Sequence, residues 1–164
     1  MKLVLLTLLL GNIAFANITC EEDKKCTVEQ NMTFWGFDLY HLKYELDKNK
    51  NEHLTLTYLR DISKEDNVEK GDEKFKANNL MSKKLSKKLD LWHAKYIDVI
   101  IGDKFEIIVD VKKKTTLMVL NKKELIEFKE IKFGSLYLNI WAGNDSVDSD
   151  VRDMIIEVRN KFKY

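Results

Sequence analysis

Residues 37–46 read FDLYHLKYEL, and successive side chains point to opposite sides if this stretch is extended. After the polar segment DKNKN at 47–51, residues 53–60, HLTLTYLR, alternate in the same way. Two alternating runs joined by a polar turn predict an antiparallel β-hairpin. One face of the first strand would carry Asp38, Tyr40, Leu42, Tyr44 and Leu46, and one face of the second Leu54, Leu56 and Tyr58.

A helical pattern replaces the alternation after this hairpin. The residues SKED at 63–66 are typical of a helix start. Further along, apolar residues recur at helical spacing: Met81, Leu85, Leu89, Trp92 and Tyr96. We expect this stripe to face the core and the neighbouring lysines to face solvent. A basic amphipathic helix that binds an anionic membrane surface is the alternative.

The second half of the chain repeats the order of strands followed by helices. Residues 105–111, 115–120 and 124–128 have strand character. Apolar residues between 133 and 141 then predict a helix that stops near Gly143. A last helix is expected from Asp148, because acidic residues begin it and basic residues end it. The sequence therefore predicts an α+β fold with an antiparallel sheet and helices on one side.

Composition excludes several classes of protein. Hydrophobic residues make up 45% of the 164 residues, which supports a packed core and argues against wholesale disorder. The 28 basic residues nearly balance the 27 acidic ones, so nothing indicates a nucleic-acid partner. Pro is absent and Gly numbers only 6, which excludes collagen-like and linker-like sequences.

The first residues have the features of a secretory signal peptide. Lys2 precedes the apolar run 3–10, and small residues stand at Ala14 and Ala16. The run is too short to span a bilayer, and no later segment is apolar enough to do so. We expect residues 1–16 to be removed and residues 17–164 to form one soluble domain, periplasmic or secreted.

Export gives the two cysteines a structural meaning. Cys20 and Cys26 enclose the short polar loop EEDKK, and in an oxidising compartment they can close into a disulfide. Zinc would need about four ligands, and His41, His53 and His93 lack zinc spacing. We therefore expect a disulfide, no metal site and no cofactor, with the histidines exposed or hydrogen-bonded.

The common catalytic motifs are missing from the sequence. It contains no Gly-rich phosphate loop, no His-Glu-x-x-His and no Gly-x-Ser-x-Gly. Residue chemistry alone predicts an exported α+β domain of unassigned activity.

The order of several short motifs nevertheless resembles a known family. Residues 34–40, FWGFDLY, and 56–61, LTYLRD, are similar to hairpin strands of bacterial chalcone-isomerase-like proteins. Residues 136–148, LYLNIWAGNDSVD, are similar to the family's ending, where an Ile-Trp-Leu-Gly segment precedes a polar loop and the last helix. The resemblance runs over residues 27–156. It implies an open-faced β-sandwich, in which a large antiparallel sheet carries helices on one face, with the ligand cleft between them.

The resemblance also implies which catalytic groups this chain lacks. Plant enzymes of the family cyclise chalcones, and an Arg before their first long strand holds the developing oxyanion. Here no Arg occurs between Cys20 and Leu59. Asp38 stands where the family has a catalytic Thr, and the position of the catalytic Tyr falls near Asn67. We therefore expect no cyclisation of a chalcone.

The leading hypothesis is a non-catalytic member of this family that binds a small apolar or amphiphilic ligand such as a fatty acid. One alternative is an isomerase or intramolecular lyase that uses Asp38 as general base and Arg60 as anion clamp. A second is an envelope interaction protein without a small ligand. An apolar cleft with a few polar groups would favour binding or catalysis, whereas a cleft filled by Trp and Tyr side chains would favour interaction. The candidate ligand contacts are Asp38, Tyr40, Tyr58, Arg60 and Trp141.

Overall fold

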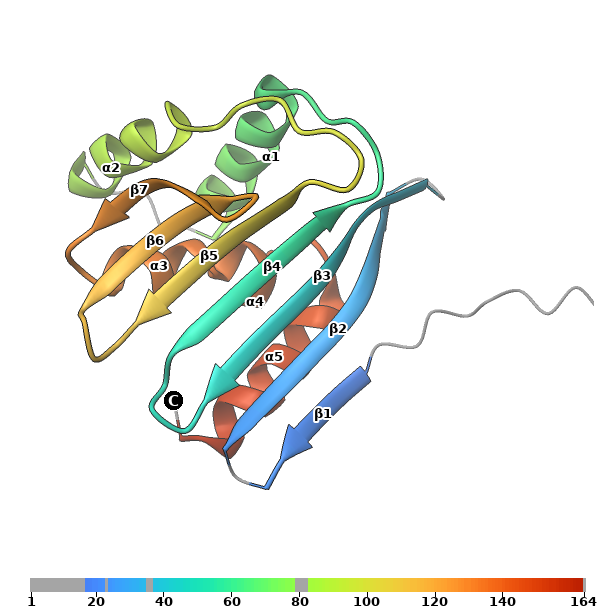
Figure 1. Ribbon diagram of the computed structural model, residues 1–164, viewed down its shortest axis with the longest axis vertical. Helices are drawn as coiled ribbons and strands as arrows, with labels where there is room; N and C mark the ends of the chain where they lie inside the picture. Colours follow the sequence, from blue (N-terminus) through green and yellow to red (C-terminus); the bar gives the residue numbers. More distant parts are fainter. Residues whose placement is uncertain (1–16, 23, 35–36, 79–82, 164) are drawn as a thin grey trace, which may run out of the picture.

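The computed structural model describes residues 17–22, 24–34, 37–78 and 83–163. The expected signal peptide, residues 1–16, lies outside the described residues, as do Trp35, Gly36 and Met81 of the motifs above. Seven strands of the described chain form one sheet, and the helices lie behind it in Figure 1. The strands are β1 (Asn17–Glu21), β2 (Lys25–Phe34), β3 (Phe37–Asp47), β4 (Glu52–Tyr58), β5 (Lys104–Asp110), β6 (Thr115–Leu120) and β7 (Lys123–Phe128). The helices are α1 (Lys64–Ala77), α2 (Lys83–His93), α3 (Lys132–Tyr137), α4 (Asn139–Ala142) and α5 (Ser149–Lys161).

The sheet is an antiparallel meander in which every strand pairs with its neighbours in sequence. The predicted hairpin is its centre, β3 with β4, where Leu42 lies opposite Leu56 and Tyr44 opposite Leu54. Every second residue of β4 is buried, as the alternation predicted. The α+β fold, with a large antiparallel sheet and helices on one face, is therefore confirmed.

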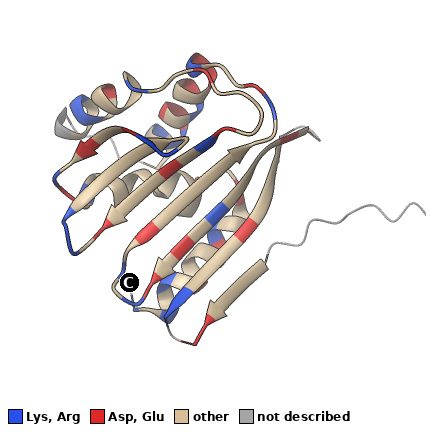
Figure 2. Cartoon of the chain, viewed as in Figure 1, with Lys and Arg blue, Asp and Glu red and all other residues tan. Residues whose placement is uncertain are grey.

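The other face of the sheet is lined by paired charges. Lys25 Nζ lies 2.9 Å and Lys43 Nζ 3.2 Å from Glu45 Oε1. His53 Nε2 lies 3.0 Å from Glu106 Oε1 on the neighbouring strand. Figure 2 shows the positions of basic and acidic residues along β2 to β5. This face is therefore compatible with water without further cover.

The helices reach the sheet in two different ways. The backbones of α3 and α5 come close to strands, α3 to β5 and β6 and α5 to β2 and β3. Gly134 permits the approach of α3, because a Cβ there would lie 2.5 Å from Val109 Cγ2. By contrast, α1 and α2 reach the interior through long, fully buried side chains such as Phe75 and Trp92. In the described chain no helix is long and apolar enough to cross a membrane.

Two predicted helix starts are confirmed. Ser63 caps α1, because its Oγ accepts a hydrogen bond of 3.1 Å from the Asp66 backbone N–H. Asp148 caps α5 in the same way, accepting from the N–H groups of Asp150 and Val151. The predicted stripe also faces the core: Leu85, Leu89 and Trp92 of α2 are buried, as is Tyr96 just beyond it.

The helix expected over residues 133–143 is two short helices instead. Leu138, with ψ of −16°, separates α3 from α4. Gly143 follows α4 in an extended conformation, near the predicted stop. Buried residues occur in succession around the break, at Tyr137, Leu138, Ile140 and Trp141.

The predicted disulfide between Cys20 and Cys26 is present in the sheet. The two residues lie directly opposite each other on β1 and β2, with Cα atoms 4.1 Å apart. Cys26 is fully buried, whereas Cys20 is on the exposed edge strand. The bond therefore holds β1 against the rest of the sheet.

A buried ion pair joins α5 to the middle of the sheet. Glu52 is fully buried at the start of β4, and Arg159 Nε and Nη2 donate to its Oε1 at 2.8 and 2.6 Å. The Tyr44 hydroxyl donates to the same oxygen at 2.7 Å. These bonds compensate the burial of both charges.

Candidate functional site

Three of the five predicted contact residues meet between the sheet and the helices. The ring centroids of Tyr40 and Tyr58 are 6.0 Å apart in an edge-on contact. The Trp141 indole Nε1 donates a hydrogen bond of 3.1 Å to the Tyr40 hydroxyl. Tyr58 and Trp141 are buried and Tyr40 packs against the same core. The pattern of aromatic residues on alternate strand positions accounts for this meeting.

The other two predicted contact residues lie on the surface. Asp38 is exposed near the start of β3. Arg60 is exposed just beyond β4, where its guanidinium lies 6.0 Å from the ring centroid of Phe37. The structure therefore does not bring Asp38 or Arg60 into the interior with the three aromatic residues.

Aromatic side chains fill the interior under α1, α2 and α3. Trp92 is fully buried at their centre, and its ring centroid lies 5.1 Å from Phe133 and 5.2 Å from Tyr137. Phe75 of α1 packs on Tyr137 at 5.3 Å, and Tyr96 stacks on Phe105 of β5 at 5.1 Å. These are contact distances for aromatic rings, so among the described residues the space between α1, α2, α3 and the sheet is packed with aromatic side chains.

Polar atoms also gather in this interior, and we call the five residues that contribute them the polar cluster: Asn67, Trp92, His93, Tyr96 and Tyr137. The hydroxyls of Tyr96 and Tyr137 are 2.7 Å apart and share one hydrogen bond. The Trp92 indole N–H lies beside both hydroxyls and lowers their pKa values as a hydrogen-bond donor does, although no hydrogen bond of full geometry joins it to a described residue. Asn67 Oδ1 accepts from the Tyr58 hydroxyl at 3.4 Å, while its Nδ2 is buried and unpaired within the described chain.

His93 fits the expectation that the histidines are exposed or hydrogen-bonded at only one of its two ring nitrogens. It is 8% exposed, and its Nδ1 lies 3.4 Å from Asp72 Oδ1. Its Nε2 has no hydrogen-bond partner among the described residues. A Cβ at Gly71 would lie 3.7 Å from this Nε2 and 3.8 Å from the Tyr137 hydroxyl, so both polar groups border Gly71.

Burial dominates the ionisation of these groups. It raises the pKa of Tyr40 and of Tyr137 to about 12. Burial also raises the pKa values of Tyr58 and Tyr96 and lowers that of His93, where the nearby Asp72 carboxylate acts in the opposite direction. All of these side chains are therefore uncharged at neutral pH.

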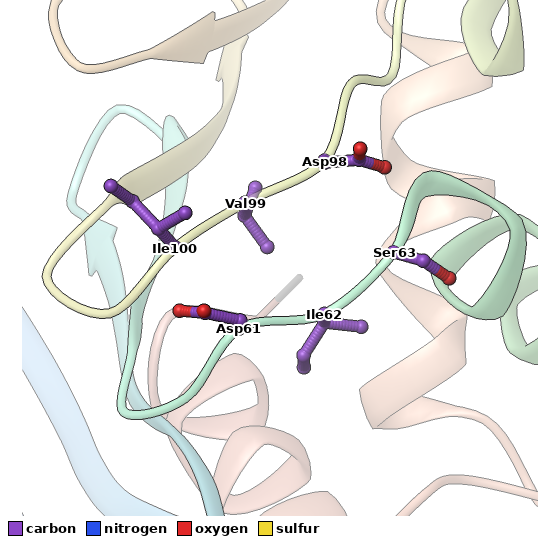
Figure 3. Close-up of a pocket in the computed structure, with 6 residues that line it drawn as sticks. All are labelled: Asp61, Ile62, Ser63, Asp98, Val99 and Ile100. Carbon is purple, nitrogen blue, oxygen red and sulfur yellow. The ribbon is translucent and has the colours of Figure 1, made fainter.

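An open depression of about 340 Å³ lies at one end of the sheet, between the β4–α1 connection and the segment that leads into β5 (Figure 3). Its lining residues are Asp61, Ile62, Ser63, Asp98, Val99 and Ile100. The two carboxylates already accept backbone hydrogen bonds, Asp61 from Ile101 at 3.0 Å and Asp98 from Lys64 at 2.8 Å. The depression thus lies between two loops, and its two carboxylates stabilise those loops by accepting backbone hydrogen bonds.

Sequence reasoning found part of this site and missed the rest. Trp92 and Tyr96 were predicted as core residues of a helical stripe, and both are buried. Their polar atoms could not be assigned a role from the sequence. An apolar stripe predicts that a Trp or Tyr is buried, but it does not predict whether the N–H or O–H of that residue has a hydrogen-bond partner. Asn67 was singled out only as the position of the family's Tyr.

Comparisons with known proteins agree with this architecture. The family described as chalcone isomerase-like has a model that matches residues 42–156, which include the whole polar cluster. A crystal structure of a fatty-acid binding protein of Arabidopsis thaliana is similar over 88% of this chain and 91% of that chain, with a TM-score of 0.62. The two sequences are 8% identical, so the likeness concerns the fold. No curated protein matches the sequence.

Proposed function

This chain belongs to the chalcone isomerase-like family, and from that premise we propose that it is an exported, non-catalytic binding protein for a small apolar or amphiphilic ligand such as a fatty acid. The fold likeness to a fatty-acid binding protein supports the ligand class. The apolar leader at residues 1–16 and the disulfide between Cys20 and Cys26 support export to a periplasm or to the medium.

The observation that carries this proposal is the set of unpaired polar atoms in the polar cluster. Trp92 Nε1 and His93 Nε2 are buried without a hydrogen-bond partner in the described chain. Each such group costs about 1–3 kcal/mol of stability. A ligand that supplies the missing hydrogen bonds would recover that cost, whereas a purely structural core would gain from apolar residues at these places.

The way the helices are attached supports ligand entry. The aromatic rings fill the interior, so a ligand has to displace some of them. The layer most easily displaced is α1 with α2, because these helices hold the sheet through side chains such as Phe75 and Trp92 and not through close backbone packing. Entry between this layer and β4–β5 leads directly to the polar cluster.

The electrostatics support a non-catalytic role. Cyclisation of a chalcone builds negative charge on oxygen, and a preorganised cation or donor set must stabilise it. Asp38 and Arg60, the residues of the isomerase alternative, lie on the surface, outside the polar cluster. A bound chalcone would therefore meet neutral phenols and an indole but neither of these charged groups.

One experiment separates binding from turnover. We expect saturable uptake of a fluorescent fatty acid or of its uncharged alcohol analogue, and no cyclisation of a chalcone above the spontaneous rate. Turnover that disappears in the Arg60→Ala variant would contradict the proposal and establish the isomerase alternative. Binding that stays unchanged in Arg60→Ala fits an interior site.

A second candidate is the interaction protein without a small ligand. The filled interior favours it, and so do large exposed hydrophobic side chains near the end of the sheet that bears the depression. These side chains are Phe37, Ile97, Ile100 and Ile101, between 54% and 66% exposed. Failure of both assays above, with the protein folded, would leave this candidate.

A further inference from the structure

The charges that act on the interior site are acidic. Asp72 and Asp90 act on His93, and Asp72 also acts on Tyr137. Two further carboxylates act on the site: Asp103 acts on Tyr58 and Asp148 on Tyr40. These carboxylates oppose the entry of an anion.

The unpaired atoms define which hydrogen bonds a ligand has to make. The Trp92 indole N–H is a donor only, and so is the Asn67 Nδ2 amide. His93 is neutral, and its Nδ1 faces the Asp72 carboxylate, which can only accept. The ring proton is therefore on Nδ1, and His93 Nε2 is left as an acceptor. The site offers donors to a carbonyl or hydroxyl oxygen and an acceptor to an O–H or N–H.

From these contacts we infer that the polar cluster takes an uncharged polar head group, such as an alcohol, a primary amide or an undissociated carboxyl group, and excludes an ionised one. This inference rests on the proposed binding function and specifies its ligand. In an undissociated acid the carbonyl oxygen accepts from Trp92 and the hydroxyl donates to His93 Nε2. An ionised carboxylate has no proton for His93 and would be buried beside carboxylates without a cation.

The free energy of burying the head group decides between a neutral ligand and an ionised one. An ionised group buried without a partner is strongly disfavoured, whereas a neutral head group costs little once it is hydrogen-bonded. Binding of a fatty acid would then require uptake of one proton from solvent. Above the acid's own pKa, its apparent affinity should fall about tenfold for each pH unit.

The test keeps the pH fixed at 8, so that the protein is the same for every ligand and a carboxylic acid ligand is ionised. Isothermal titration calorimetry compares four ligands of one chain length: decanol, decanamide, decanoate and decanesulfonate. We expect decanol and decanamide to bind at least tenfold more tightly than either anion. Decanoate or decanesulfonate binding as tightly as decanol would overturn the inference but leave the proposed function intact. If none of the four binds, the proposed function fails and the inference fails with it.

Variants of the polar cluster locate the site. Trp92→Phe removes the indole N–H and should weaken decanol binding about fivefold to tenfold, the usual effect of one hydrogen bond. Asn67→Leu removes the second hydrogen-bond donor, from a half-buried residue, and should also weaken decanol binding. Leu91→Ala, which changes a 56% exposed residue of the same helix, is the control and should bind as the unchanged chain does. Equal decanol affinity in folded Trp92→Phe and Asn67→Leu would overturn the assignment to this cluster.

Discussion

Among single side chains, Arg159 has the clearest consequence for stability. Its guanidinium makes two hydrogen bonds to the fully buried Glu52. Arg159→Ala would leave that carboxylate buried without its cation. We expect a loss of about 3–5 kcal/mol in the free energy of unfolding, measured by urea denaturation.

The same helix offers a matched control for this change. Arg152 pairs with Asp153, whose side chain is 66% exposed. Arg152→Ala should therefore cost less than about 1 kcal/mol. If Arg159→Ala lowers the free energy of unfolding as little as Arg152→Ala does, the ion pair with Glu52 does not stabilise the fold.

Gly134 is a second position at which a single substitution should alter the packing of a helix on the sheet. An added Cβ would lie 2.5 Å from Val109 Cγ2 and 2.6 Å from Thr116 Oγ1, so α3 would have to move off the sheet. Gly134→Ala should destabilise the protein by about 1–3 kcal/mol, despite the better helix propensity of Ala. Gly71→Ala on α1 is the control, because its nearest contact outside the helix is 3.7 Å. Thermal denaturation of both variants checks this, and an unchanged melting temperature for Gly134→Ala would contradict it.

Among the strands, β1 depends on its covalent bond. It pairs only with β2, and most of its residues are exposed. A disulfide that closes so short a loop stabilises by about 2–3 kcal/mol on a chain-entropy estimate. We expect Cys20→Ser to lower stability by this amount and to release β1 from the sheet.

Amide hydrogen exchange localises the effect of Cys20→Ser. Exchange of the β1 amides that pair with β2 should become fast, while exchange in β3 and β4 stays slow. Global acceleration of exchange would show instead that β1 is integral to the core. Free-thiol titration of the unchanged, unreduced protein should detect no thiol.

The elements that sequence reasoning found share one physical property: one buried side and one exposed side. This produces the alternation of β3 and β4 and the helical stripe of Leu85, Leu89 and Trp92. Where a segment does not have one buried and one exposed side, its secondary structure was not predicted correctly. β1 is exposed at almost every position, and the chain around Leu138 is buried in succession, so neither has a period to detect.

The polar cluster was beyond sequence reasoning for a different reason. Its residues come from separate elements: Asn67 from α1, Trp92 and His93 from α2, Tyr137 from α3. Whether a buried N–H has a partner depends on how these elements stack, which no local pattern encodes. The aromatic contact of Tyr40 and Tyr58 was within reach because it follows from strand register.

At the scale of the whole molecule, the buried tyrosine hydroxyls predict how stability changes at alkaline pH. Burial raises the pKa of Tyr40 and Tyr137 from 10 to about 12. In the unfolded chain these phenols ionise near pH 10, so they stabilise the fold fully below that pH. The contribution is lost as the pH rises from 10 towards 12. We expect the melting temperature to fall over this range.

Phenolate absorbance and circular dichroism, followed together, check the alkaline prediction. The phenolate signal of the buried tyrosines should appear with the loss of structure. Tyr40→Phe should show a shallower fall of melting temperature above pH 10, because one buried phenol is gone. Ionisation of the buried phenols near pH 10 in a protein that stays folded would contradict the expectation.

The proposed export makes a separate prediction. Cleavage after Ala16 should leave Asn17 as the first residue of the exported protein. N-terminal sequencing of material from the periplasm or the medium measures this directly. Met1 at the start of that material would refute cleavage.

The path of the chain between β4 and β5 has an evolutionary consequence. These strands are hydrogen-bonded neighbours, yet residues 59–103, with α1 and α2, intervene between them. Two backbone bonds close the excursion at its base, Gly102 N–H to the Tyr58 carbonyl and Tyr58 N–H to the Asp103 carbonyl. The entropic cost of such a loop grows only slowly with its length. Changes in the length of this segment should therefore be tolerated in evolution, provided that the side chains it contributes to the core, such as Phe75 and Trp92, are kept.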